Sequence, residues 1–277
     1  MSEGGGDRTV RVTVPVVDAE LAADRLWQAG ASAIEERVVP SGLVLVAGGE
    51  PGPLLSAVAD RWPAEAVVVD LDAALDAWRP YARAIRVGDR LVVRPPWLPP
   101  AGGDGVVEAV VDPGRAFGSG AHPSTRLALA ALVDRVRGGE RVLDVGCGSG
   151  VLALAALALG ASGAVGVDID PAARDATAAN AARNGMSARL AVTDTVGRLA
   201  VTDTIGGRYP LVVANLLLPD LLALAPAIAA ATEDGGTLVV SGVLVTQRAA
   251  VEAAFGWATV VATTDDGWLA LTLTLAR

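Results

Sequence analysis

The most informative stretch of this 277-residue chain contains three glycines at alternate positions. The stretch is VLDVGCGSG, Val142 to Gly150, and it joins an apolar strand-like run to an apolar helix-like run. Glycine lets the backbone turn sharply and approach a ligand with no Cβ in between. The glycines are Gly146, Gly148 and Gly150, with Val151 where the dinucleotide pattern GxGxxG needs its last glycine. The pattern predicts a ligand-binding loop and argues against a nicotinamide dinucleotide.

Two acidic residues lie at and just after the end of the next predicted strand, in AVGVDID. Asp168 ends this strand, where a carboxylate can accept hydrogen bonds from both hydroxyls of a ribose. Asp170 precedes Pro171, which is the order of a helix cap followed by proline in the first turn. We therefore assign Asp168 to a ligand and Asp170 to capping. The alternative interpretation makes both residues surface caps.

A third polar strand end is Asn215, in VVANLLLPDLL. In open α/β sheets the ligand lies beside the carboxyl ends of the strands. Asn215 is therefore either a turn former or a substrate contact, and the spacing favours neither.

The segment VDPGRAFGSGAHPST, Val111 to Thr125, holds His122, the only histidine. Its glycines and prolines suit either a tight connector or a loop that closes over a ligand. His122 could be a general base, but His-Pro before a helix more often shapes the turn or hydrogen-bonds the loop. Cys147, the only cysteine, has no nearby partner for a triad, so we interpret it as a small residue packed behind the ligand.

Alternating strand and helix patterns position these residues from Ser124 onward. Such βαβ order predicts a mostly parallel sheet with helices on both faces, closed by an antiparallel strand at Trp268 to Ala276. The clearest helices are expected at 125–137 and 219–231, and the clearest apolar strands at 141–145, 211–214 and 237–241.

The N-terminal part has a different rhythm. A strand in TVRVTVPV, a helix from Asp18 to Ala29 capped by Asp18, and two short strands at 32–36 and 42–47 predict a small α/β domain over residues 1–52. Proline-broken helical patterns predict a linker over 53–80, followed by the main domain over 81–277. Segments 90–94 and 106–111 are expected to form a strand pair around the turn WLPPAGGDG.

One oddity is a direct repeat, in which LAVTDTVG (190–197) recurs as LAVTDTIG (199–206). Its period is far too short for a solenoid unit. We interpret it as a local loop duplication with no function attached.

Composition bounds the class of protein. A hydrophobic content of 52% allows a sizeable core, and a net charge of -9 argues against nucleic-acid binding. A single cysteine excludes an intrachain disulfide and suits a cytoplasmic protein, and MSEGGGDR lacks a signal-peptide pattern. The longest apolar run, Val151 to Val167, is too short to span a bilayer, so no membrane is expected. We expect a monomer.

The motifs together resemble a known family. Asp-x-Gly-x-Gly-x-Gly is similar to the loop of class I S-adenosylmethionine-dependent methyltransferases, which are Rossmann-like. More specifically, the chain resembles PrmA-type methyltransferases, which modify the eleventh protein of the large ribosomal subunit. Their hallmark DPG-x-AFG-[ST]-G-x-HP-[ST]-T appears as Asp112 to Thr125, Asn-[IL]-Leu as Asn215 to Leu217, and Gly-Gly-x-Leu…Ser-Gly-[IV]-Leu as Gly235 to Leu244. The resemblance covers roughly Asp76 to Gln247, while the first 70 residues match only in pattern.

This resemblance implies a seven-stranded α/β domain that binds S-adenosyl-L-methionine. By motif position, Thr125, Gly146, Asp168 and Asn215 would contact the cofactor, Gly148 and Gly150 would complete its loop, and Asp144 could receive its ammonium. Phe117, with the run Gly118-Ser119-Gly120, would be a flexible cover near the methyl group. No metal ligands are predicted.

The resemblance also implies the reaction. A lysine side chain or N-terminal amine of the ribosomal protein would be methylated, and the small N-terminal domain would recognise that protein. A lysine amine has a pKa of about 10.4 and must first lose its proton, which desolvation favours. Asn215 could orient the amine through its side-chain carbonyl, with no strong base required.

Three alternatives stay open. The same core could act on another protein or on a small-molecule amine. The chain could also be a non-catalytic binding module that keeps the fold, although its intact glycine loop, Asp168 and Asn215 argue against this. A nicotinamide dehydrogenase fits poorly because of the glycine spacing.

Overall fold

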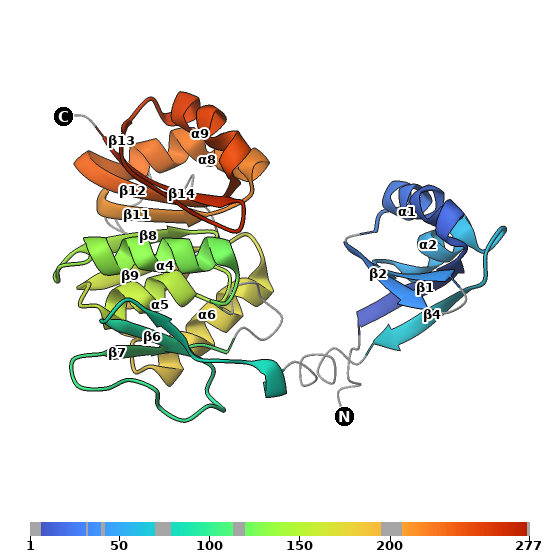
Figure 1. Cartoon of the computed structure of the whole chain (residues 1–277), viewed down its shortest axis with the longest axis horizontal. Helices are drawn as coiled ribbons and strands as arrows, with labels where there is room; N and C mark the ends of the chain where they lie inside the picture. The colour runs from blue at the N-terminus through green and yellow to red at the C-terminus, as the bar shows by residue number, and fades with distance from the viewer. Residues whose placement is uncertain are drawn as a thin grey trace. The chain divides into compact units, whose positions relative to one another are not determined.

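The computed structural model describes residues 7–31, 33–39, 42–69, 79–112, 120–194 and 207–275. The chain divides into two compact units, Met1–Tyr81 and Ala82–Arg277 (Figure 1). Each unit has hydrophobic core residues of its own.

The N-terminal unit is an antiparallel sheet with two helices on one face (Figure 1). Alternate residues of the strands, such as Val10, Val12 and Leu45, are buried against Leu26 and Leu54 of the helices, because strand side chains alternate between faces. The sheet order is β2-β3-β1-β4, with β1 at Asp7–Val14, β2 at Ala33–Val39, β3 at Gly42–Gly48 and β4 at Ala64–Val69. The helices are η1 (Val16–Asp18), α1 (Ala19–Gln28) and α2 (Pro51–Val58).

The prediction of a linker over residues 53–80 is wrong for the first part of that range, because these residues belong to the N-terminal unit. Helix α2 runs to Val58, and β4 pairs with β1 from Asp7↔Val69 to Val12↔Ala64. The prolines of PGP lie in the first turn of α2, where a missing N–H has no helical partner to lose, so they start a helix where we expected a break. Residues 70–78 lie outside the described part, and η2 (Arg79–Tyr81) ends the unit.

Asp18 was predicted to cap α1, but its side chain makes no capping hydrogen bond. The carboxylate instead accepts a hydrogen bond from Trp62 Nε1 at 3.1 Å and pairs with Arg61 Nη2 at 3.2 Å. A partner remote in the sequence therefore outweighs the local capping preference.

The C-terminal unit is built on a seven-stranded sheet, which confirms the predicted fold class. All neighbours from β10 to β12 are parallel, and β14 runs antiparallel between β12 and β13. The order is β10-β9-β8-β11-β12-β14-β13, with bounds β8 Arg141–Val145, β9 Gly163–Val167, β10 Leu190–Thr193, β11 Tyr209–Asn215, β12 Thr232–Leu244, β13 Ala258–Asp265 and β14 Trp268–Thr274. We did not predict β13, a largely exposed edge strand. The direct repeat starts in β10, and the rest of it, from 195 to 206, lies outside the described residues.

Helices cover both faces of this sheet, because its strands are apolar on both sides. Val142 and Val213 belong to one core with α4 and α5, whereas their neighbours Leu143 and Val212 belong to a second core with α8 and α9. The bounds are α4 Pro123–Arg135, α5 Val151–Ala158, α6 Pro171–Arg183, α8 Leu218–Ala231, η3 Val245–Gln247 and α9 Arg248–Phe255. Within the described residues, every helix is too short or too polar to cross a membrane.

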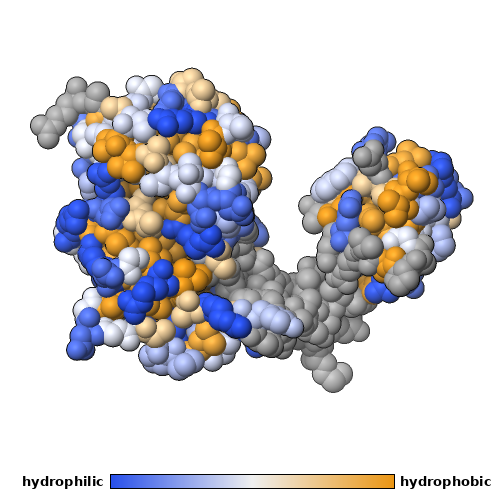
Figure 2. All heavy atoms as spheres, viewed as in Figure 1, coloured by the Kyte–Doolittle hydropathy of each residue, from blue (hydrophilic) through white to orange (hydrophobic). Residues whose placement is uncertain are grey.

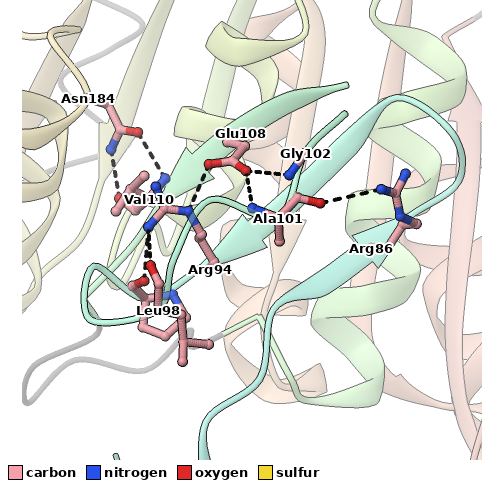
Figure 3. Close-up of polar contacts among 9 residues, drawn as sticks. Arg86, Arg94, Leu98, Ala101, Gly102, Glu108, Val110 and Asn184 are labelled. Carbon is pink, nitrogen blue, oxygen red and sulfur yellow. Dashed lines mark hydrogen bonds and ion pairs between the residues drawn. The ribbon is translucent and has the colours of Figure 1, made fainter. Parts of the chain in front are cut away.

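A three-stranded sheet precedes α4, formed by β5 (Ile85–Val87), β6 (Leu91–Arg94) and β7 (Val107–Val110). The predicted pair β6 and β7 exists, but it is parallel, so the stretch between the strands crosses over and is not a hairpin turn. Figure 3 shows what holds this crossover: Arg94 donates to Glu108 Oε2 and to Leu98 O, both at 2.8 Å. Glu108 Oε1 accepts from Ala101 N at 2.7 Å and Gly102 N at 2.6 Å.

Candidate active site

A cavity of about 710 Å³ lies at the carboxyl ends of the parallel strands. Its volume is in the range of small-molecule sites, about 300–1,000 Å³. Of the predicted site residues, five line it: Thr125, Gly146, Gly148, Asp168 and Asn215. Gly146, Gly148, Asp168 and Asn215 meet here because each one ends or follows a strand of the same sheet, whereas Thr125 comes from the first turn of α4. Phe117, Gly118 and Ser119 lie outside the described residues.

The glycine loop follows β8 and turns sharply at Gly146, whose φ is +73°. A Cβ on this residue would clash with the side chain of Leu216, which also lines the cavity. The amides of Gly146 and Cys147 both donate to Val167 O, at 2.8 and 3.0 Å. The loop is thus fixed against the end of β9, and only glycine fits its first turn.

Asp168 is held by the backbone on both sides. Its Oδ2 accepts from Gly148 N at 2.9 Å and its Oδ1 from Asp170 N at 3.0 Å. Each carboxylate oxygen keeps a further lone pair, so the side chain can still accept ribose hydroxyls. Asp170 caps α6 by accepting from Ala172 N at 2.9 Å, which confirms its predicted capping role.

Asp144 lies behind the loop and is fully buried. Its Oδ2 accepts from Ala153 N at 3.0 Å, so it caps α5, whose N-cap residue Gly150 has no side chain to do so. Burial and the charge of Asp168 raise the pKa of Asp144 to about 7, against the opposing hydrogen bond from Ala153. Neither Asp144 nor Gly150 is among the described residues that line the cavity, so their cofactor contacts stay predictions.

Asn215 ends β11, and its amide is oriented by a residue from another element. Asn215 Nδ2 donates to Thr125 Oγ1 at 3.2 Å, and Thr125 is buried in the first turn of α4. Gly242 lies on the other side, with φ +82°, where a Cβ would come within 2.8 Å of Asn215 Oδ1. The missing side chain at Gly242 therefore keeps space beside the carbonyl oxygen of Asn215.

His122 caps α4 and shapes the turn before it, which is the role that we predicted as the more common one for His-Pro before a helix. Its Nδ1 accepts from Ser124 N at 3.3 Å as the N-cap of α4 and lies 2.8 Å from Ser124 Oγ. The ring packs edge-on against Trp268, with ring centroids 4.7 Å apart. His122 also lines the cavity.

Cys147 packs against helix α6. The thiol is buried, with Sγ 3.4 Å from Thr177 Oγ1. Burial, and next the charge of Asp144, raise the pKa of this thiol to about 12, so it is not a nucleophilic thiolate at neutral pH. This agrees with the prediction of a packing residue.

The cavity wall combines carboxylates with apolar and neutral polar side chains. Besides Asp168 it includes Asp194 and Asp220, whereas no arginine is among its described lining residues. Our sequence reasoning missed both residues. Asp194 comes directly after β10, so the strand-end rule that found Asp168 could also have found it. Three carboxylates in one wall favour a positively charged ligand.

Comparisons with known proteins agree with this geometry. A family profile for "Ribosomal protein L11 methyltransferase (PrmA)" matches residues 66–276. A ribosomal protein L11 methyltransferase from Thiobacillus denitrificans is 36% identical in an alignment that covers 95% of this chain and 97% of that protein. One from Symbiobacterium thermophilum is 40% identical over 198 residues, 70% of this chain, and the match spans only 63% of that relative.

Among solved structures, the crystal structure of a ribosomal protein L11 methylase from Lactobacillus delbrueckii subsp. bulgaricus is similar, with a TM-score of 0.62 and 28% identity. The similarity covers 70% of this chain and 100% of that one. Because the family profile matches well over half of the chain, the chain belongs to the ribosomal protein L11 methyltransferase (PrmA) family.

Proposed function

We propose that this protein transfers methyl groups from S-adenosyl-L-methionine to amino groups of ribosomal protein L11. Membership of the family supports the methyltransferase class, its cofactor and this substrate. The observation that carries the proposal is that the glycine loop, Asp168 and Asn215 line one cavity. It thus has room for a nucleoside-bearing cofactor next to a polar group that can orient an amine.

The residues present fit the cofactor. The backbone of the glycine loop is exposed to the cavity at Gly146 and Gly148, Asp168 can accept ribose hydroxyls, and the acidic wall suits a positive charge. Bound S-adenosyl-L-methionine supplies a methyl group on a positively charged sulfur. Thr125 and Asn215 also line the cavity and complete the proposed binding set.

The chain's own task is to prepare and align the substrate amine. A lysine amine, with a pKa of about 10.4 in water, must be neutral to react. Apolar side chains such as Val145, Leu152 and Leu216 favour the neutral form by desolvation, against the opposing effect of the carboxylates in the wall. Asn215 Oδ1 can accept a hydrogen bond from the amine and so direct its lone pair, because Nδ2 is engaged by Thr125. No strong base is required, and His122, which caps α4, is not assigned one.

We further propose that the N-terminal unit recognises the protein substrate. Apolar side chains at and before α1 are exposed there, Val17 to 90% and Trp27 to 51%. Figure 2 shows hydrophobic residues gathered on this unit over its helices. Exposed apolar surface of this kind marks interaction sites in many proteins. A monomer in the cytoplasm, without direct contact to nucleic acid, completes the proposal.

The experiment is mass spectrometry of purified ribosomal protein L11 incubated with this protein and S-adenosyl-L-methionine. Mass gains in steps of one methylene support the proposal, and fragmentation locates the amines. Cofactor binding without any gain would leave another protein or a small-molecule amine as substrate, and a panel of both would be tested in the same assay. Absence of cofactor binding would overturn the proposal and favour a non-catalytic module.

A further inference from the structure

Helix α6 carries a stripe of polar side chains that the reaction does not use. Thr177, Asn180 and the C-cap residue Asn184 are spaced three and four residues apart, so they lie on one face of the helix. Thr177 and Asn180 are almost completely buried, at 0% and 1% exposure. Buried polar groups destabilise a protein unless they are hydrogen-bonded, so their partners indicate what the stripe is for.

Two members of the stripe bind the back of the glycine loop. Thr177 Oγ1 donates to Gly148 O at 2.8 Å, and Asn180 Nδ2 donates to Ser149 O at 3.0 Å. These carbonyls precede α5, which begins at Val151. The helix also packs closely here, since a Cβ at Gly150 would lie 2.8 Å from Thr177 Cγ2.

Asn180 uses its whole hydrogen-bonding capacity. Its Nδ2 donates to Asp112 O at 2.8 Å as well as to Ser149, and its Oδ1 accepts from Asp112 N at 2.9 Å and Arg183 Nη1 at 2.6 Å. One amide therefore joins the glycine loop to the segment that leaves β7. The N-cap residue of α6, Asp170, also donates its backbone N–H to Asp168 Oδ1. The same helix is therefore linked to both the glycine loop and Asp168.

Asn184 provides a natural comparison. It accepts from Val110 N at 2.9 Å and donates to Val110 O at 2.7 Å, as Figure 3 shows. It thus tethers β7 as Asn180 tethers Asp112, but within the described residues its side-chain hydrogen bonds go to Val110 and Asn180 and not to the glycine loop. If tethering β7 and the segment after it were the only role of these asparagines, replacing either one should have the same effect on cofactor binding.

We propose that Asn180 is a positioning residue for cofactor binding, which fixes the Ser149 carbonyl and hence the shape of the glycine loop without touching the cofactor. The inference rests on the proposed function, because that loop must bind S-adenosyl-L-methionine. Thr177 supports the same loop one residue earlier, at Gly148.

The test compares Asn180→Asp with Asn184→Asp in the full chain. Each change removes the NH₂ donor, keeps an oxygen acceptor of the same shape and adds a carboxylate, so the added charge is common to both variants. Calorimetry with S-adenosyl-L-methionine should give a Kd about tenfold higher for Asn180→Asp, since a buried carbonyl loses its donor. The Kd of Asn184→Asp for the cofactor should stay within about twofold of the wild-type value, although this variant also has a lower Tm than the wild type. At saturating cofactor, kcat of Asn180→Asp should be largely retained while the KM for the cofactor rises.

A second variant covers the case in which Asn180→Asp does not fold. Thr177→Val keeps the side-chain shape and removes the donor to Gly148 O, so its Kd should also rise about tenfold. Unchanged cofactor affinity in the folded variants, or an equal loss in Asn184→Asp, would overturn the inference. A wild-type protein that does not bind the cofactor would instead remove the proposed function itself, so the two failures are distinguishable.

Discussion

Asn215 at the end of β11 and Thr125 in the first turn of α4 are joined by a hydrogen bond of 3.2 Å, although 90 residues separate them in the chain. The bond occupies the amide nitrogen of Asn215 and leaves its carbonyl oxygen to the cavity. Ser241 of β12 fixes the same turn of α4 by donating to Ser124 O at 2.8 Å. Three elements therefore set the direction of one amide.

Replacing Asn215 tests whether this amide aligns the substrate. Asn215→Ala should lower kcat by about a hundredfold, the scale expected when a reacting group loses its alignment, with a much smaller change in cofactor Kd. Thr125→Val, which keeps the shape but loses the anchoring hydroxyl, should lower kcat by about tenfold. Steady-state kinetics and calorimetry measure both. Equal kcat in Thr125→Val and the wild type would show that the anchor has no role in turnover.

Replacing Asp168 tests the proposed ribose contact. Asp168→Ala should raise the Kd for S-adenosyl-L-methionine by about a hundredfold, because hydrogen bonds to a charged acceptor contribute about 1.5–3 kcal/mol each. Asp170→Ala is the matched control, since it removes only the cap of α6. It should lower the Tm and leave the Kd nearly unchanged. An unaltered Kd in Asp168→Ala would exclude the contact.

Replacing His122 separates a capping role from a catalytic one. His122→Asn should keep both the helix cap and most of the activity, because asparagine is a favourable N-cap residue. His122→Ala should lose about 1 kcal/mol of stability with most of kcat retained. Activity and thermal unfolding are measured side by side. A collapse of kcat in both variants at unchanged stability would make His122 a catalytic residue.

The buried Asp144 predicts a dependence of stability on pH. Its pKa is about 7 in the folded protein, above the ordinary value of 3.8, so between these values the folded state holds a proton that the unfolded chain has lost. This group's contribution to stability therefore falls as the pH rises, by about 1.4 kcal/mol per pH unit within this window. Above the folded pKa the loss is complete.

Asp144→Asn removes this titration and keeps an oxygen that can accept from Ala153 N. Urea unfolding of both proteins without cofactor, at pH 5 and pH 7, measures the difference in free energy of unfolding. The Asn variant should gain on the wild type as the pH rises. A difference that stays constant between the two pH values would show that Asp144 is ionised in the folded state throughout.

The sequence by itself determined the βαβ order, the glycine loop and the strand-end positions of Asp168 and Asn215. These depend on local features: apolar runs that form buried strands, glycines that allow a tight turn, and polar residues that directly follow a strand. The rule that parallel strands present their carboxyl ends at one edge of the sheet then places them together. The cavity contains both residues, as this reasoning expected.

Only the tertiary structure decided what depends on partners remote in the chain. Residues 64–69, predicted as part of a linker, form strand β4 because they pair with β1. Strand β6 pairs in parallel with β7, and the ion pair between Arg94 and Glu108 holds the crossover between these strands. Asp144 is buried behind the loop, and Asn180 reaches both Ser149 and Asp112. The free energy of such contacts comes from segments that meet only after folding, so no local pattern in the sequence marks them.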